Sequence, residues 1–439
     1  ISIKIWFKLR YLKLKFLYWD CINCLGSRMI KIIKAPLQLE PFLEKFKDLF
    51  TKPSYRSFRD LCAALSVCDK SKTVANLCDT MADCREGKKA RSSYNWFFSD
   101  ANWDENEVAQ RKVDLFIDKS SLKDNDKILL IIDDTYNEKD GTQTEGVGKF
   151  YDHCKEAYIW GNNFVTSVIQ LKGLFIPHKA KMYIKDSDDN ENFQTKLEIA
   201  YNEIIKPLKV PENLNCYIVF DSWWSSTDLI DKCLKLGHNI VCQIKSDRKV
   251  GVNKIMYYQV RDMANQIEDK YFIKTIINVR GKRKTYFAFE KNVILDNIGV
   301  VKLVISKRKK DHTTKYIICT NSDLSSKEII SIYEDRWDIE TAHRETNQKL
   351  GFKDYQLREK HSIERFIQLV FSVWSAILFW EMDNPPSMDG SKSRTMGDMI
   401  DRVKMQAVGE TFEYVLTYFN IPVPDGGLLY ILKQLGMKI

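Results

Sequence analysis

Hydrophobic residues recur at steps of three and four positions along the N-terminal part of the chain. The segments 39–50, 57–68 and 73–84 all show this spacing, which predicts helices. Asp104 stands directly before a further periodic segment, 105–118, and is a suitable N-cap for a fourth helix. We therefore expect residues 29–119 to form a small helical domain.

The pattern changes to strands at 127–135, an apolar run that contains Asp133 and Asp134 at its end. A short run bounded by polar residues fits a strand that is buried on both faces. The predicted elements that follow are strands at 158–171 and 174–184, a helix at 191–205, a strand at 216–221, a helix at 226–237 and a strand at 239–245. This β-β-β-α-β-α-β order matches an RNase H-like core, whose first and fourth strands lie side by side and end at one edge of the sheet.

Strand-like segments between 250 and 322 interrupt this order and carry basic turns at 281–284 and 306–312. Such turns are often only solvated, but two of them in one insertion favour phosphate contact. We expect an α/β fold, in which the RNase H-like catalytic core is interrupted by a mostly β insertion and preceded by a small helical domain. The predicted units are 29–119 (helical), 120–249 (core, first part), 250–322 (insertion), 323–384 (core, second part) and 385–439 (C-terminal tail region).

A long helix is predicted in the second part of the core. Ser325 and Glu328 have the spacing of a capping box, and Gly351 is expected to end the helix after about Lys349. The apolar run 366–380 is interrupted by polar residues and is too short to span a bilayer, so it predicts a buried helix and no membrane partner.

Composition adds a modest basic charge and unpaired thiols. Lys and Arg exceed Asp and Glu by nine (68 − 59), which suits a polyanionic partner and equally a basic housekeeping enzyme. The eleven cysteines form no framework apart from the lone CxxC of Cys21 and Cys24, so we expect reduced thiols in a cytoplasm. Residues 1–28 do not resemble a signal peptide, and Met29 is interpreted as the natural start.

Three residues of the predicted long helix form one stripe. At about 100° per residue, Tyr333, Arg336 and Glu340 fall within a sector of about 60°. For an isolated charged helix this arrangement usually means a solvated face with an i, i+4 ion pair.

Acidic residues supply the candidate chemistry: one of Asp133 and Asp134 on the first strand, Asp221 after the fourth, and Glu340 on the helix. Carboxylates at the ends of adjacent strands repel one another unless a cation lies between them. Two hard divalent ions held by carboxylates can support in-line attack on a phosphodiester, and oxygen ligands suit Mg²⁺ or Mn²⁺. Each acid alone is more often a strand-end cap or a turn residue.

Three motifs, in this order, carry a family resemblance: "IIDDTYNEKDG", "YIVFDSWWSS" and "YEDRWDIETAHRETNQKLG". They resemble the DDE transposases of bacterial insertion sequences, in the cut-and-paste group with a β insert and a Tyr-Arg-Glu-Lys signature, over about residues 90–380. By this resemblance Asp134, Asp221 and Glu340 are the catalytic residues and metal ligands, while Tyr333 and Arg336 bind DNA phosphate. Because successive strand residues point to opposite faces, Asp133 is expected to point away.

The resemblance implies a DNA transposase that nicks at the ends of its element, releases it through hairpins and joins the 3′-hydroxyls to target DNA. Its cofactors are two Mg²⁺ (or Mn²⁺) ions per active site. Its partner is double-stranded DNA, namely terminal inverted repeats and target DNA. It implies a homodimer on paired ends, an N-terminal domain that binds DNA, and a place in the cytoplasm with the nucleoid.

The sequence departs from the family in two places. Asn347 stands where the family has its lysine, and Lys349 lies about 160° round the helix. Arg344, inside the stripe, is therefore a candidate phosphate ligand, although it can equally be an exposed arginine paired with Glu340 or Glu345. The insertion contains no tryptophan, so a pocket for a flipped base would use an aromatic residue such as Tyr286 or Phe287.

Two other functions remain open at this point. An RNase H-like nuclease or resolvase uses the same acidic site without joining strands, and a strand-transfer assay separates it from a transposase. A decayed, non-catalytic DNA-binding derivative is favoured by Asn347 but not by the intact acidic triad.

Overall fold

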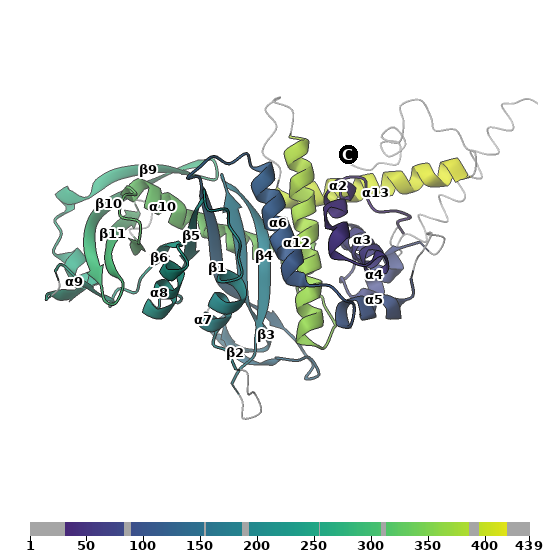
Figure 1. Ribbon diagram of the computed structural model, residues 1–439, viewed down its shortest axis with the longest axis horizontal. Coiled ribbons are helices and arrows are strands. Elements are labelled where there is room, and N and C mark those ends of the chain that lie inside the picture. The colour runs from purple at the N-terminus through teal and green to yellow at the C-terminus, as the bar shows by residue number, and fades with distance from the viewer. Residues whose placement is uncertain are drawn as a thin grey trace, which may run out of the picture.

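A mixed, twelve-stranded sheet runs through the centre of the molecule, with a β-rich part at one end and a helical part at the other (Figure 1). The computed structural model describes residues 31–82, 89–152, 155–186, 193–253, 255–308, 313–385 and 395–418. Several features noted in the sequence lie outside these residues: residues 1–28 with their CxxC motif, Met29, residues 309–312 of the second basic turn, and much of the C-terminal tail.

Short helices form the N-terminal part of the structure. They are α2 (Glu40–Leu43), η1 (Glu44–Leu49), α3 (Lys52–Val67), α4 (Val74–Thr80), α5 (Arg91–Ser99) and α6 (Glu105–Lys119). Asp104 caps α6 as predicted, because its carboxylate accepts a hydrogen bond from the backbone N–H of Asn106 at 2.7 Å. These helices share one hydrophobic core with the sheet and with α12 (Lys360–Asp383), while α13 (Met396–Tyr418) extends beside them.

The predicted buried helix at 366–380 is confirmed as part of α12. This helix is long and apolar enough to cross a membrane, but its apolar stretch is wholly buried inside the fold. A buried ion cluster joins it to the sheet: the Lys181 ammonium lies 2.9 Å from Glu364 and 3.0 Å from Glu105. Although burial opposes the charge of Lys181, the two carboxylates raise its pKa.

The core strands have the predicted neighbours. They are β1 (Lys127–Glu138), β2 (Gly148–Asp152), β3 (Ala157–Leu171), β4 (Leu174–Tyr183), β5 (Asn215–Phe220) and β6 (Asn239–Gln243). β1 pairs with β3 in the antiparallel sense and with β5 in the parallel sense. The first and fourth predicted strands therefore lie side by side. The sequence pattern missed β2, which is only five residues long.

The expected β insertion is attached to the core sheet through backbone pairing. Its elements are β7 (Lys249–Gly251), β8 (Tyr257–Gln259), α9 (Val260–Asn265), η3 (Asp269–Tyr271), β9 (Ile273–Val279), β10 (Lys282–Leu295), β11 (Gly299–Arg308) and β12 (Thr314–Cys319). β12 pairs with β6, so the strands of this region continue the core sheet instead of forming a separate one. This pairing satisfies the outer edge of β6, which would otherwise expose unpaired backbone groups.

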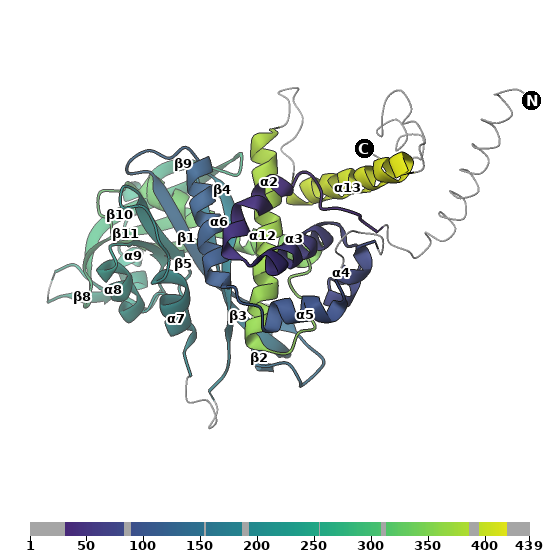
Figure 2. The same ribbon diagram turned by 45° about the vertical axis from the view of Figure 1, so that its right-hand side comes forward.

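Helices cover both faces of the core. α7 (Lys196–Ile199), the π-helical segment η2 (Ala200–Ile205) and α8 (Thr227–Lys235) lie on one face (Figure 2). α10 (Ser326–Asp335) and α11 (Trp337–Lys349) lie on the other. On β1, even-numbered residues such as Ile132 pack in the cluster that includes α8, whereas odd-numbered ones such as Ile131 pack with α10 and α11.

The helix that carries the stripe begins and ends as predicted. Ser325 and Glu328 form the expected capping box. At the other end, Gly351 adopts φ +70°, a conformation that glycine favours, and the backbone N–H of Phe352 donates to Thr346 O at 3.1 Å.

The expectation of one uninterrupted helix is wrong, because α10 ends at Asp335 and α11 starts at Trp337. The N–H of Arg336 donates to Tyr333 O, three residues back, at 3.2 Å. This tightened turn accompanies the engagement of the Arg336 side chain with β1, described below. Periodicity in the sequence does not register such a local change in hydrogen bonding.

Candidate metal and phosphate site

Two strand ends bring acidic residues to the face of the sheet that α11 covers. The last registered pair of β1 and β5 is Ile131 with Val219, and Asp133 and Asp221 each stand two residues further along. Both odd-numbered positions continue the face that packs against α10 and α11. Burial and the negative charges of Asp134 and Asp221 raise the pKa of Asp133 to about 7, although Arg336 acts in the opposite direction.

Arg336 links the first strand to Glu340. Its Nη1 lies 3.2 Å from Asp133 Oδ2, and its Nη2 lies 2.6 Å from Glu340 Oε1. The other Asp133 oxygen accepts a hydrogen bond from the backbone N–H of Asp134 at 2.9 Å. The predicted shared side of Arg336 and Glu340 is therefore confirmed. The expectation that Asp133 points away is wrong, because the parity of β1 directs its carboxylate toward α11.

Asp134 has different partners, supplied by α7 and β3. Its Oδ2 lies 2.5 Å from Lys196 Nζ and accepts a hydrogen bond from Asn163 Nδ2 at 3.0 Å. The Lys196 ammonium also lies over three aromatic rings, at 5.3 to 5.5 Å from their centroids; these are Tyr136, Tyr183 and Trp223. In this structure Asp134 is therefore part of a lysine and aromatic cluster on the α7 side.

Asp221 and Tyr333 lie near each other but make separate hydrogen bonds. Asp221 Oδ1 accepts from the backbone N–H of Trp223 at 2.8 Å, as a strand-end turn residue does. The buried Tyr333 hydroxyl donates to Gln243 Oε1 at 2.9 Å. Burial, together with the charge of Asp221, raises the pKa of Tyr333 against the effect of Arg336, so its phenol stays protonated.

The two cations near the end of α11 have different surroundings. Lys349 Nζ lies 3.3 Å from Asp401 on α13, so this side chain is directed away from the stripe, as expected. Arg344 is exposed. Its phosphate role stays a prediction.

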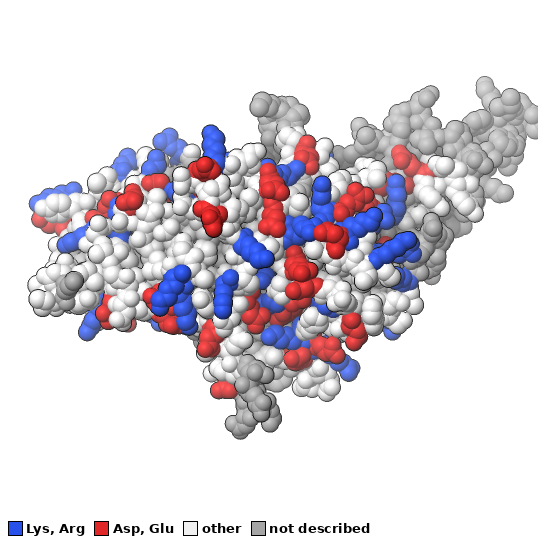
Figure 3. Space-filling view, viewed as in Figure 1, with Lys and Arg blue, Asp and Glu red and all other residues white. Residues whose placement is uncertain are grey.

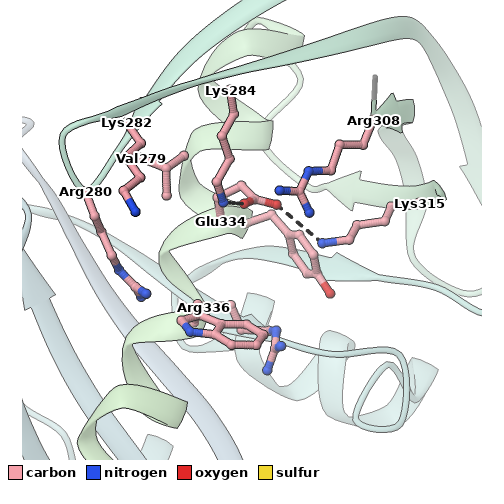
Figure 4. A pocket seen from close by; sticks show the side chains of 10 residues that line it. Val279, Arg280, Lys282, Lys284, Arg308, Lys315, Glu334 and Arg336 are labelled. Carbon is pink, nitrogen blue, oxygen red and sulfur yellow. Dashed lines mark hydrogen bonds and ion pairs between the residues drawn. The ribbon is translucent and has the colours of Figure 1, made fainter. Parts of the chain in front are cut away.

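A basic cavity of about 480 Å³ opens beside Arg336, between α10 and the β-rich part (Figure 4). Lys284 and Lys315 pair with Glu334 at 2.7 and 3.3 Å, which leaves the cavity with an excess of positive charge. Its lining residues are Val279, Arg280, Lys282, Lys284, Arg308, Lys315, Tyr333, Glu334, Arg336 and Trp337.

The exposed aromatic residue of this cavity is neither Tyr286 nor Phe287, the two residues expected to stack a flipped base. Tyr286 is only 2% exposed and lies in the hydrophobic core, and Phe287 packs against the main core. Trp337, in contrast, lines the cavity with 49% of its surface exposed. The signal in the sequence was a tryptophan placed directly after Arg336 in a charged segment, where the burial of a large ring is not expected.

His343 on α11 contacts the sheet next to the acidic residues. This residue was not singled out from the sequence. Its Nε2 lies 2.7 Å from Thr166 Oγ1, and that hydroxyl donates to the backbone oxygen of Asp133 at 3.0 Å. Burial lowers the pKa of His343 to about 4, so the ring is neutral at pH 7. This chain of contacts holds Glu340, one turn earlier on α11, against the end of β1.

Asp133 and Glu340 lie on either side of Arg336, and the charge of Asp221 acts on Asp133. These three residues offer carboxylate oxygens, which are the ligands that a hard divalent ion prefers. Within the described ranges, no three acidic, histidine or cysteine side chains are gathered closely enough to hold an ion as they stand. The Arg336 guanidinium bridges Asp133 and Glu340 and supplies positive charge there.

Comparison with known proteins agrees with this chemistry. Residues 45–254, slightly less than half of the chain, match the model of a family described as DDE superfamily endonuclease. No curated protein matches the sequence. The matched segment carries Asp133, Asp134 and Asp221 and ends before α10. Over this segment the chain is similar to endonucleases of the DDE superfamily.

Proposed function

We propose that this protein is a DNA transposase, which binds the ends of a mobile element and catalyses metal-dependent strand cleavage and strand transfer. The observation that carries the proposal is that Asp133, near the end of β1, and Asp221, directly after the neighbouring parallel strand β5, influence each other's charge, while Arg336 ties Glu340 to Asp133. Carboxylates from neighbouring strand ends and one helix suit the two-ion chemistry of phosphodiester attack.

The first carboxylate comes from the pair at 133 and 134. The family resemblance points to Asp134, whereas the contacts with Arg336 favour Asp133. Asp221 and Glu340 complete the set, and Mg²⁺ or Mn²⁺ bound there would activate a water or a 3′-hydroxyl and stabilise the leaving oxygen. Arg336 orients the phosphate that enters between Asp133 and Glu340.

The basic cavity supports a role for the β-rich part in holding DNA. Arg280 and Lys282 bind phosphate there, and Trp337 offers an exposed ring for stacking a displaced base. Arg344 contacts the backbone from the exposed face of α11. On the molecular face drawn in Figure 3, cations and anions are interspersed, so the net positive charge is not concentrated on that face.

The remaining features follow from the same proposal. The helices of 29–119 bind the terminal inverted repeats, two copies assemble on paired double-stranded DNA ends, and the protein works in the cytoplasm with the nucleoid. Target DNA enters at the same acidic site. Inverted repeats with short direct duplications beside the gene would support this class of reaction.

The decisive experiment compares wild type with Asp221→Asn on labelled DNA taken from the ends that flank the gene. The variant should lose cleavage and strand transfer while end binding changes little, because it removes a metal ligand without adding bulk. Parallel loss of binding and cleavage would make Asp221 structural. Cleavage by the wild type without any strand joining would instead identify a nuclease or resolvase.

A further inference from the structure

An aromatic surface lies on the hairpin of β2 and β3, outside the acidic site and the basic cavity. Tyr151, Tyr158 and Trp160 are 40%, 65% and 42% exposed. The strand register places Tyr151 opposite Tyr158 and Lys149 opposite Trp160, so all four side chains stand on one face of the hairpin. Phe150 and Ile159 alternate with them and are buried on the other face. We call the four residues of the exposed face, Lys149, Tyr151, Tyr158 and Trp160, the hairpin platform.

Each ring of the platform is oriented by a specific contact. The Tyr151 and Tyr158 centroids are 5.3 Å apart, with their planes at 73°. Lys149 Nζ lies 4.5 Å from the centre of the Tyr158 ring. The Trp160 indole N–H donates to Gly141 O at 3.2 Å, which orients the ring and leaves much of it exposed. Exposed rings that are preordered in this way lose little conformational entropy when a planar ligand stacks on them.

We propose that the hairpin platform binds unpaired bases of a DNA strand that extends from the acidic site. Three rings with one lysine suit base stacking more than phosphate tracking, because surfaces that follow the backbone depend on many cations. The inference rests on the proposed function only in taking DNA as the substrate.

The separation between the acidic site and the platform, measured along β3, can be spanned by a short single strand of DNA. Thr166 pairs with Asp133, and Trp160 stands six residues earlier on the same strand. At roughly 3.3 Å per residue the platform is about 20 Å from the acidic edge. At roughly 3.4 Å per nucleotide, this corresponds to about six nucleotides of stacked strand. A strand separated at the cleavage point can therefore reach the platform.

The test measures binding of fluorescein-labelled oligo-dT of about twelve nucleotides, within the usual range of single-strand site sizes, and of a blunt duplex. The double variant Tyr158→Ala with Trp160→Ala should weaken oligo-dT binding at least about tenfold while duplex affinity stays within about twofold. Tyr271→Ala is the matched control, because this tyrosine is 54% exposed and lies under Lys270 at 5.1 Å but belongs to another part of the chain.

Tyr158→Ala alone should also weaken oligo-dT binding, but by a smaller factor. Because it keeps the hydrogen bond of Trp160, this variant still tests the proposal if the double variant fails to fold. Unchanged oligo-dT affinity, or an equal loss for duplex and oligo-dT, would overturn the proposal. A change in oligomeric state by sedimentation with unchanged oligo-dT affinity would assign the platform to a second copy of the chain. Because binding needs no cleavage, failure of the Asp221→Asn experiment leaves this result interpretable.

Discussion

The two neighbouring aspartates on β1 allow a direct test of which face of the strand is catalytic. We consider Asp133→Asn and Asp134→Asn, which each replace a carboxyl group by a neutral amide of the same shape. If Asp133 is the first carboxylate, its loss should lower the cleavage rate by at least about 10²-fold, equivalent to about 2.7 kcal/mol of transition-state stabilisation. Arg336 keeps its partner Glu340 at 2.6 Å, so we expect little loss of fold stability.

Asp134→Asn should instead lower fold stability and leave the cleavage rate nearly unchanged. Its partner Lys196 has only 14% of its side chain exposed, so weakening this contact should cost about 1.5–3 kcal/mol of folding free energy. The three rings around Lys196 remain and limit the cost. Cleavage of correctly folded protein should change by less than about tenfold, since the carboxylate faces α7.

The assay follows nicking of a labelled duplex with Mg²⁺ and with Mn²⁺, and urea unfolding monitors stability in parallel. DNA binding by fluorescence anisotropy serves as the control for both variants. If Asp134→Asn abolishes cleavage while Asp133→Asn retains it, the assignment from the parity of β1 is wrong. The family resemblance would then identify the ligand correctly.

Three further outcomes are expected. Arg344→Ala should reduce strand cleavage far more than Lys349→Ala, whose exposed ion pair with Asp401 is worth at most about 1 kcal/mol; the reverse order would remove Arg344 from the site. Neutral substitutions at 282–284 should weaken DNA binding and lower the salt slope by about 0.9 for each phosphate that the protein no longer neutralises, which a salt titration measures. Lys181→Met should lower the free energy of unfolding by about 3–5 kcal/mol, because Glu364 loses its buried counter-charge and Glu105 keeps only the more distant Arg365 at 3.8 Å; urea unfolding at pH 7 checks this.

Features set by short-range pattern were predictable from the chain itself. Asp104 and the Ser325–Glu328 capping box mark helix starts because their side chains bond backbone groups only two or three residues away. The side shared by Arg336 and Glu340 follows from their four-residue spacing, because α11 begins directly after Arg336. The adjacency of β1 and β5 was predicted because the order of elements matches an RNase H-like core, in which the first and fourth strands are neighbours.

Features set by contacts between distant segments were not predictable. Asp133 and Asp134 are chemically identical, and only the packing of Ile131 against α11 and of Ile132 against the opposite helices decides which carboxylate meets Arg336. The tightened turn at Arg336 likewise accompanies a contact 203 residues away in the chain. Amino-acid sequence determined the local elements and the acidic motifs of this protein, because these depend on neighbouring residues. Tertiary structure decided which side chains meet, because the side of the sheet on which a residue contacts a helix depends on how the sheet and the helices pack.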